Sequence, residues 1–364
     1  MKVLVIGAGI GGLTAALALS RAGHAVTLAE KAAQFSPVGA GIILAPNAAQ
    51  ALASLGVDLA PHGRALSTMV VQTAAGTVLQ RIEPERLATQ YGPLWALSRP
   101  KLHEALVAAL PGSVEVQLGT SVTDLDDATA KYELVVGADG LHSQVRERLL
   151  GPVPLRYSGT TCWRGLLKNP GFDHALEAWG GAARVGLVPL RDDQLYYYLV
   201  HAAPLRAPTL SWPDGFRAAF GHFRGGVERL WDAWREAPPL HHDLQELEAP
   251  HWGRGRVLLL GDAAHAMTPN QGQGAAMAVE DAIGLTQALA GGPEGVLERY
   301  VAARHQRVRT VQLDSRRLGA VAHWQHPLAR GVRDGLLRLV PASAGDAQYR
   351  RLIEPGLALL QPAR

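Results

Sequence analysis

Gly7, Gly9 and Gly12 stand between an apolar run and a helix-forming run, in the pattern G-x-G-x-x-G. In that context the first glycine makes a tight turn, the second lets a pyrophosphate approach the backbone, and the third lets helix and strand pack closely. The start of the helix adds free N–H groups and partial positive charge, which stabilise phosphates. Glu30 ends the next apolar run, where a carboxylate can accept hydrogen bonds from a ribose 2′-hydroxyl. These residues predict a site for the adenosine half of FAD or NAD, because the carboxylate would repel the 2′-phosphate of NADP.

A second group of residues that could do chemistry lies in LLLGDAAHAMTPNQGQGAAMAVEDA, residues 258–282. Asp262 follows an apolar strand, at the end where open α/β sheets bind ligands, so it can accept a hydrogen bond from a sugar or ribityl hydroxyl. The loop over 269–274 allows close backbone approach through its glycines. The helix predicted over about 275–290 would stabilise negative charge on the N1/C2=O edge of a reduced flavin. We interpret the loop as an isoalloxazine site; the alternative is a glycine-rich connection that binds nothing.

The elements that must position these residues are of two kinds. Strands over 2–6 and 25–30, with a helix over 11–22 between them, form one βαβ unit, and 257–260 is a further buried strand. Alternating runs instead predict two antiparallel hairpins, 68–72 with 77–82 and 185–190 with 195–200. From residue 296 the pattern is helical, and LARGVRDGLLRLV is an amphipathic segment that ends at Pro341.

The fold class is therefore α/β, with a Rossmann-like FAD-binding domain interleaved with a mainly antiparallel β-sheet domain and followed by a helical C-terminus. Because the two kinds of element alternate along the chain, we expect both domains to be discontinuous. We expect the FAD-binding domain over 1–67, 98–155 and 253–295. We expect the substrate-binding β-sheet domain over 68–97 and 156–252, and the C-terminal helices over 296–364.

Composition and charge exclude several classes of protein. Of 364 residues, 48% are hydrophobic and 18% are charged, as in soluble globular proteins. The net charge of +3 comes from scattered arginines with interspersed acids, so we expect no nucleic-acid partner. Cys162 is the only cysteine, which rules out an internal disulfide and a thiolate metal site. His241, His242 and Asp243 are neighbours in a predicted polar loop and would point apart, so we expect no metal site there.

The N-terminus resembles a signal peptide in composition, but its ordered glycines argue against that interpretation. No apolar run reaches the ~18 to 20 uncharged residues of a membrane span. We therefore expect a cytoplasmic monomer or homodimer that has neither a membrane nor a nucleic acid as its partner.

Three motifs occur in the order typical of one enzyme family. They are GAGIGG over 7–12 with Glu30-Lys31, VVGADGLHSQVR over 135–146, and GDAAHAMTPNQGQG over 261–274. Between them lie GAGIILAPNA, LSRPKLHEAL and TCWRG, at 39–48, 97–106 and 161–165. Over nearly its whole length the chain resembles the class A, single-component FAD-dependent aromatic hydroxylases. These form the 4-hydroxybenzoate hydroxylase-like group, which includes salicylate, 6-hydroxynicotinate and urate hydroxylases.

The resemblance implies where FAD binds. It puts Glu30 on the adenosine ribose, Arg99 near the pyrophosphate and ribityl chain, and Val122 at the adenine through its backbone. It puts Asp262 on the ribityl chain and Pro269 near the face of the flavin that reacts with oxygen. The full set of expected cofactor contacts is Gly7, Gly9, Ile10, Gly11, Gly12, Glu30, Lys31, Gly41, Arg99, Val122, Asp139, Asp262, Gly272, Gln273, Gly274, Ala275 and Ala276.

The middle motif allows two interpretations. Asp139, Gly140, Ser143 and Arg146 belong to a motif that the family associates with both FAD and NAD(P)H. Taken alone, GADG is a strand end and a turn, with Ser143 capping a short helix.

The resemblance also implies the reaction. NADH or NADPH reduces the flavin, O2 adds to give a flavin C4a-hydroperoxide, and its distal oxygen is transferred to an electron-rich aromatic or heteroaromatic small molecule. The protein must then exclude water, position the ring and help to deprotonate a phenol. An epoxidase or antibiotic-modifying oxygenase of the same fold and a non-catalytic FAD-binding sensor are the alternatives.

The residues expected around the substrate come from the antiparallel sheet. Strand alternation groups Tyr196 with Tyr198, and Cys162 with Arg164, each pair on one face of its strand. The expected catalytic residues are Pro269, Tyr196, Tyr198 and Arg164, and the expected substrate-binding residues are Arg184 and His201. For each sheet residue the alternative is a side chain packed or solvated on the outer face.

The chain departs from the family at two places. Only 126–133 remains where members carry a longer hairpin, so the adenine end of the site should be more open. Ile43 follows GAGI, where 6-hydroxynicotinate-type members place a histidine base, so that base is missing here.

Overall fold

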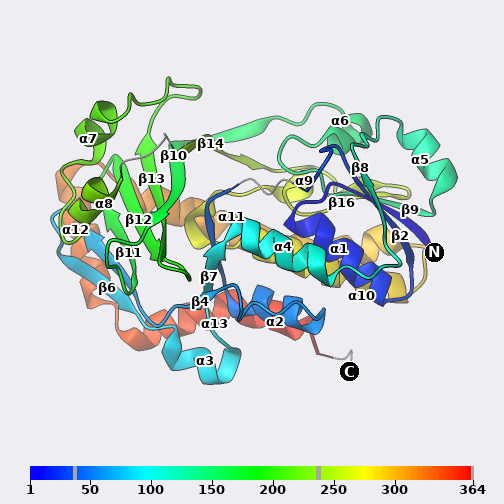
Figure 1. Cartoon of the computed structure of the whole chain (residues 1–364), viewed down its shortest axis with the longest axis horizontal. Coiled ribbons are helices and arrows are strands. Elements are labelled where there is room, and N and C mark those ends of the chain that lie inside the picture. Colours follow the sequence, from blue (N-terminus) through cyan, green and yellow to red (C-terminus); the bar gives the residue numbers. More distant parts are fainter. Residues whose placement is uncertain (36–38, 235–238, 362–364) are drawn as a thin grey trace.

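The computed structural model describes residues 1–35, 39–234 and 239–361. Two large sheets lie side by side along the longest axis of the molecule, and helices run between and beneath them (Figure 1). Among the described residues, none of the helices is long and apolar enough to cross a membrane.

The first sheet is mainly parallel and forms the Rossmann-like part of the fold. Its strands are β1 (Lys2–Ile6), β2 (Ala25–Glu30), β8 (Glu115–Leu118), β9 (Leu134–Gly137), β15 (Gly253–Arg254) and β16 (Val257–Leu259). They lie in the order β15-β16-β9-β1-β2-β8, and only β15 runs antiparallel to its neighbour. The helices α1 (Ile10–Arg21) and α10 (Gly274–Ala290) pack against each other beside this sheet. The predicted βαβ unit and the later buried strand are thus confirmed.

The order of these strands explains how distant motifs come together. The three motifs lie at the carboxyl ends of β1, β9 and β16, which are neighbours in the sheet. Because these strands are parallel, their carboxyl ends lie at one edge, the edge at which open α/β sheets bind ligands.

The second sheet is mainly antiparallel, as the sequence predicts. Its strands are β5 (Met69–Thr73), β6 (Val78–Ile82), β10 (Leu155–Lys168), β11 (Ala175–Trp179), β12 (Ala183–Pro189), β13 (Gln194–Ala202) and β14 (Leu240–Leu247). They lie in the order β14-β10-β13-β12-β11-β5-β6, and only β11 and β5 pair in parallel. Both predicted hairpins are present, with strand limits that differ by at most two residues.

The prediction of a polar loop over 241–243 is wrong, because these residues belong to the strand β14 at the edge of the second sheet. An edge strand pairs on one side only and tolerates polar side chains, which is why its sequence resembles a loop. His241 stacks on Trp163, with ring centroids 4.7 Å apart. His242 pairs with Cys162 across the strands and points to the other face.

A small third sheet connects the two large ones. It contains β3 (Gly41–Leu44), β4 (Arg64–Ala65) and β7 (Trp95–Ser98), in the order β3-β7-β4. Around it lie α2 (Pro46–Ser54), α3 (Glu85–Tyr91) and α4 (Arg99–Ala109). The segment that replaces the family hairpin contains a short helix, α5 (Leu125–Lys131), whose first N–H groups are capped by Asp124. A second short helix, α6 (Gln144–Leu150), follows β9.

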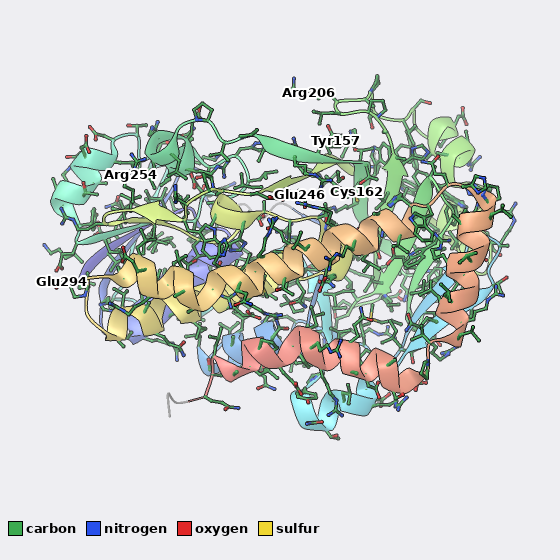
Figure 2. All side chains as sticks on the ribbon, turned by 180° about the vertical axis from the view of Figure 1, so that it is seen from behind. Tyr157, Cys162, Arg206, Glu246, Arg254 and Glu294 are labelled. Carbon is green, nitrogen blue, oxygen red and sulfur yellow. The ribbon has the colours of Figure 1, made fainter. Side chains whose placement is uncertain are left out.

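Helices cover the outer side of the antiparallel sheet and complete the C-terminus. α7 (Asp214–Phe220) and α8 (Glu228–Ala233) pack on the face that carries Trp163 and Tyr197. α11 (Val296–Ala322) is long and reaches from the parallel sheet to the antiparallel one (Figure 2). It is followed by α12 (Pro327–Leu339) and α13 (Ala342–Ala358), and α13 packs against α2. The helical C-terminus is therefore confirmed.

Candidate flavin and substrate site

The glycine loop after β1 has the backbone that a dinucleotide site requires. Gly7 has φ of 103°, a conformation that other residues rarely adopt. A Cβ on Gly12 would overlap the Gly7 carbonyl oxygen, so no larger residue fits there. A Cβ on Gly9 would meet no described atom within 4 Å, which leaves room for a phosphate beside the start of α1. No side chain of the described residues caps α1, and its first turn carries no acid. Its N–H groups and positive end therefore suit an anion.

Glu30 anchors this loop from the end of β2. One oxygen of its carboxylate accepts a hydrogen bond from the Ala8 N–H at 2.8 Å, and the other accepts from the Ala32 N–H at 2.9 Å. Each carboxylate oxygen can accept a second hydrogen bond, so both remain able to bind a ribose hydroxyl. Lys31 is exposed beside it. The Val122 carbonyl, on the neighbouring segment, accepts from Arg148 at 2.9 Å, so its backbone is held in place.

The GADG motif builds local structure, as one of its two interpretations predicts. The Asp139 carboxylate accepts from the Ser143 hydroxyl at 2.5 Å and from the Gln144 N–H at 2.8 Å. The Ser143 hydroxyl oxygen in turn accepts from the Arg146 N–H at 2.9 Å, which caps α6. The buried Arg146 guanidinium donates to the Ala263 carbonyl at 3.0 Å. This motif therefore ties the strand end of β9 to the GDA motif after β16.

The GDA motif opens a short helix, α9 (Asp262–His265), and is fixed by a buried ion network. The Asp281 carboxylate of α10 accepts from the Gly261 N–H at 3.1 Å, from His265 at 2.5 Å and from Arg304 at 2.8 Å. Burial opposes the charge of Asp281, but His265 and Arg304 outweigh it and lower the pKa of its carboxyl to about 2. Asp262 itself is exposed, at the strand end where a ribityl hydroxyl was expected.

The PNQGQG loop forms one turn of 3-10 helix, η1 (Pro269–Gln271), followed by Gly272 in the left-handed conformation. A Cβ on Gly272 would meet no described atom within 4 Å. The buried Gln273 side chain accepts from Asn47 at 3.0 Å, and Asn47 also donates to Glu280 at 2.7 Å. α10 begins at Gly274, and its first turn has neither an acid nor a side-chain cap from the described residues. Its positive end is thus directed at the loop.

The two nucleotide loops lie close to each other. A Cβ on Gly11 would lie 2.9 Å from Leu260 Cδ2 and 3.2 Å from Ala278 Cβ, so the first turn of α1 packs directly on α10. The motifs after β1 and β16 therefore share one edge, although more than two hundred residues separate them in the chain.

One face of the antiparallel sheet is turned toward this edge. Tyr196 lies over Gly41, where a Cβ would overlap its ring, and Tyr198 lies over Gly186 in the same way. Their ring centroids are 5.7 Å apart. Tyr197 points to the opposite face, in the core beneath α7 and α8. The prediction that Tyr196 and Tyr198 share one face of their strand is confirmed.

The charges of Arg99 and Arg164 act on Tyr196, and that of Asp262 acts on both arginines. Burial lowers the pKa of Arg99, and Arg164 lowers it further, whereas Asp262 and Tyr196 raise it. Burial raises the pKa of Tyr196 to about 12, against the effect of Arg164. Tyr196 is therefore a hydrogen-bond donor near neutral pH, not a base. This group joins the GDA motif to the antiparallel sheet.

Glu177, on β11, connects several of the predicted substrate residues and was missing from the sequence-based candidates. Its carboxylate accepts from Tyr198 at 3.0 Å, from Trp179 at 3.0 Å and from Arg184 at 3.1 Å. Arg184 is buried and also donates to Asn270 of η1 at 2.7 Å. The sequence contained one signal for Glu177, since it is an acidic residue among the apolar residues of the run LEAW.

His201 is not brought to this group. It lies on the face of Tyr197, edge-on to Phe220 with ring centroids 5.9 Å apart. His242 instead pairs with Cys162 across the strands, and burial and the charge of Arg164 lower its pKa. From the sequence, His242 was a candidate only as a metal ligand.

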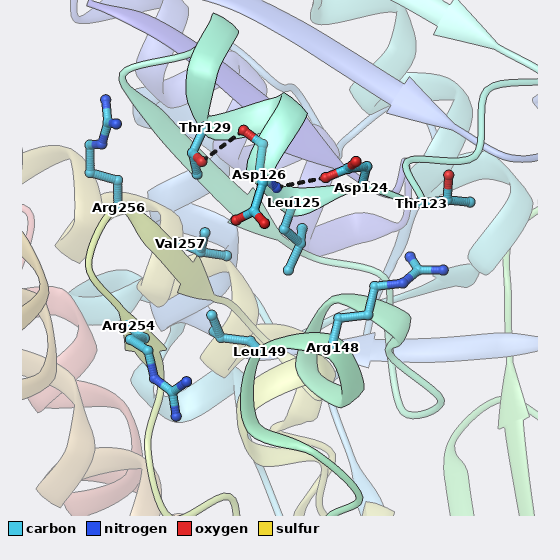
Figure 3. Close-up of a pocket in the computed structure, with 10 residues that line it drawn as sticks. All are labelled: Thr123, Asp124, Leu125, Asp126, Thr129, Arg148, Leu149, Arg254, Arg256 and Val257. Carbon is cyan, nitrogen blue, oxygen red and sulfur yellow. Dashed lines mark hydrogen bonds between the residues drawn. The ribbon is translucent and has the colours of Figure 1, made fainter.

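A separate cavity of about 720 Å³ lies at the other end of β16 (Figure 3). Thr123, Asp124, Leu125, Asp126, Thr129, Arg148, Leu149, Arg254, Arg256 and Val257 line it. Val257 begins β16, whereas Asp262 follows its carboxyl end, so this cavity lies away from the GDA motif. It adjoins the Val122 segment through Thr123 and Arg148.

Comparison with known proteins assigns the class that this fold and site define. Residues 1–162 and 239–314 match the FAD binding domain family. The chain belongs to the family of FAD-dependent aromatic hydroxylases and monooxygenases, whose cofactor is FAD.

Several characterised relatives are similar over nearly their whole length. The chain is 35% identical to the 2-heptyl-3-hydroxy-4(1H)-quinolone synthase of Pseudomonas aeruginosa strain UCBPP-PA14, over 97% of each chain. It is 31% identical to the FAD-dependent urate hydroxylase of Mycolicibacterium vanbaalenii, over 90% of each. The crystal structure of Klebsiella pneumoniae HpxO with FAD and uric acid has a TM-score of 0.87 and 27% identity, over 98% of this chain and 97% of that one.

Proposed function

We propose that this enzyme uses NADH or NADPH and O2 to hydroxylate a small heteroaromatic ring of the 4-quinolone kind. The proposal is supported by the position of Tyr196 over Gly41 and by Arg99 and Arg164, whose charges interact both with Tyr196 and with Asp262 of the GDA motif. The 35% identity with a quinolone synthase favours a bicyclic keto or enol substrate with an apolar substituent.

The described residues fit FAD. The space beside Gly9 would take the pyrophosphate, and Glu30 would accept from the adenosine ribose. Arg99 and Asp262 would hold the ribityl chain, with residues 272–276 along the pyrimidine edge of the flavin. Bound there, the flavin accepts a hydride from NAD(P)H and activates O2 for transfer of one oxygen atom to the substrate. We also propose the domain limits expected from the sequence, with one exception. The limit at residue 97 falls inside β7, and this strand pairs with β3 of the FAD-binding domain.

The residues of the antiparallel sheet would bind and orient the substrate. Tyr196 keeps its proton near neutral pH, because burial raises the pKa of its phenol, so it can donate to a ring oxygen. The Tyr198 hydroxyl donates its one proton to Glu177, so its oxygen is an acceptor toward the substrate. Glu177 orients Tyr198 and Arg184 by accepting from both. Arg164 would stabilise a deprotonated, electron-rich ring by its positive charge. Pro269 would contact the opposite side of the ring from the loop.

The test uses purified enzyme reconstituted with FAD. We expect 4-quinolones to stimulate NAD(P)H consumption, with less than stoichiometric hydrogen peroxide and one labelled oxygen atom in the product from 18O2. Hydroxypyridines, salicylate and urate serve as comparison substrates. Stimulation with full release of peroxide for every compound would contradict the proposed substrate class. Bound FAD without any stimulated turnover would instead favour a non-catalytic sensor, and an epoxide product would favour an epoxidase.

A further inference from the structure

The helix α12 carries an apolar stripe on its outer side. Leu328 is 76% exposed, Val332 59%, Leu336 61% and Leu339 79%. These positions are separated by three or four residues, so their side chains lie along one side of the helix. The stripe continues at the helix ends with Trp324 and Val340, which are 40% and 38% exposed. Contiguous apolar surface of this kind marks a site of interaction.

The opposite side of α12 fixes the direction of the stripe. Leu337 packs into a cluster with Leu79, Ala322 and Trp179 of the antiparallel sheet and α11. Arg333 is buried and donates to the Ala322 carbonyl at 3.0 Å. Its guanidinium carbon lies 5.1 Å from the centroid of the Trp179 ring. α12 is thus anchored at the edge of the molecule beside β6 (Figure 1). The exposed side chains of the stripe lie on the side of the helix away from these contacts.

The charges around the stripe are mainly positive. Residues 327–351 contain five arginines and two aspartates. Both aspartates are paired, Asp334 with Arg333 at 2.7 Å and Asp346 with Arg86 at 3.3 Å. Arg338 on α12 and Arg351 on α13 are exposed. An apolar stripe flanked by arginines matches the acyl boundary and the anionic headgroups of a phospholipid surface.

We propose that α12 docks this enzyme on the surface of an anionic phospholipid bilayer, lying in the interface with its apolar stripe against the lipid. The sequence predicted no membrane partner, because it contains no apolar run long enough to span a bilayer. A twofold contact between two copies through the same stripe would bring like-charged arginines together, which favours lipid over a second copy.

The docked helix would lie next to the proposed substrate pocket. Trp179 contacts Arg333 of α12 on one side and donates to Glu177 at 3.0 Å on the other. A substrate with an apolar substituent partitions into lipid. A docked α12 would therefore hold the Trp179 side of the pocket close to the bilayer that contains the substrate. This last step depends on the proposed function, whereas docking itself does not.

The test measures how much FAD-reconstituted enzyme sediments with vesicles. We expect binding to vesicles of phosphatidylglycerol and phosphatidylcholine, and weaker binding to phosphatidylcholine alone. The double variant Leu336→Glu/Leu339→Glu should lower the partition coefficient at least about tenfold, because charge is expelled from the acyl boundary. Arg338→Glu should lower binding to the anionic vesicles selectively. Leu205→Glu is the matched control, since Leu205 is 45% exposed in the segment between β13 and α7.

Retained FAD absorbance and an unchanged melting temperature show that each variant is folded. Equal vesicle binding by the double variant and the wild type would overturn the proposal. A wild type that remains in the supernatant with every vesicle would also overturn it. The same holds if the only effect of the stripe variant is a change from dimer to monomer in light scattering. Vesicle binding that depends on the stripe, in a protein that hydroxylates no quinolone, would support docking while the proposed function fails.

Discussion

Replacing Glu177 by glutamine tests whether this carboxylate positions the substrate side of the site. In the structure it accepts hydrogen bonds from Tyr198, Trp179 and Arg184, at 3.0 to 3.1 Å. Glutamine has nearly the same shape and keeps one acceptor oxygen, but it removes the negative charge and turns the other acceptor into a donor. The variant therefore weakens the contacts of Arg184 and Tyr198 without leaving a cavity.

The expected loss follows from the kind of hydrogen bond that is weakened. A hydrogen bond to a charged group contributes ~1.5–3 kcal/mol and one between neutral groups ~0.5–1.5 kcal/mol. The difference for the Arg184 contact is ~1–1.5 kcal/mol, because both side chains are largely buried. If that energy positions the substrate, Glu177→Gln lowers kcat/KM about tenfold. Tyr198→Phe should lower kcat/KM by a smaller factor in the Glu177→Gln variant than in the wild type, because Glu177 acts through Tyr198.

The assay is substrate-stimulated NAD(P)H consumption, with peroxide release measured in parallel. The ratio of peroxide to product should rise in the variant, because a loosely held ring is hydroxylated less efficiently. Glu85→Gln is the control, since Glu85 is exposed on α3. An unchanged kcat/KM and an unchanged peroxide ratio, or fully additive effects of the Glu177 and Tyr198 variants, would refute the positioning role.

Three further predictions follow from buried contacts. Gly12→Ala should give a protein with less than a tenth of the bound FAD, because its Cβ would overlap the Gly7 carbonyl oxygen; the flavin-to-protein absorbance ratio measures this. Gly41→Ala should displace the Tyr196 ring and raise KM more than it lowers kcat, whereas an unchanged KM would contradict this placement. Asp281→Asn should destabilise the protein by ~3–5 kcal/mol, since it removes one of the carboxylates that pair with the buried Arg304. Folding lowers the pKa of this carboxyl from 3.8 to about 2. Its contribution to the free energy of unfolding is therefore complete above pH 3.8 and is lost as the pH falls through about 2. Denaturation curves measured across that pH range should show this loss.

Local patterns predicted the nucleotide side of the fold well. The glycines of the first loop and the hairpins of the antiparallel sheet are specified by short runs of sequence, so their positions were predicted to within a few residues. The strand β14 was mistaken for a loop, because an edge strand needs no apolar pattern. The short α5 was not predicted either, although Asp124 is a typical N-cap.

The substrate side depends on strand pairing, which the sequence does not give. Glu177 reaches Tyr198 because β11, β12 and β13 lie side by side in one register. No local pattern contains that register. The placement of His201, in contrast, could have been predicted, because strand alternation separates it from Tyr198.

A crystal structure of the enzyme reconstituted with FAD tests most directly whether two distant segments bind one flavin. We predict the pyrophosphate beside Gly9, the pyrimidine edge of the ring along 272–276, and the ring facing Tyr196 and Tyr198. A flavin bound elsewhere, or protein that retains no FAD after reconstitution, would contradict this arrangement.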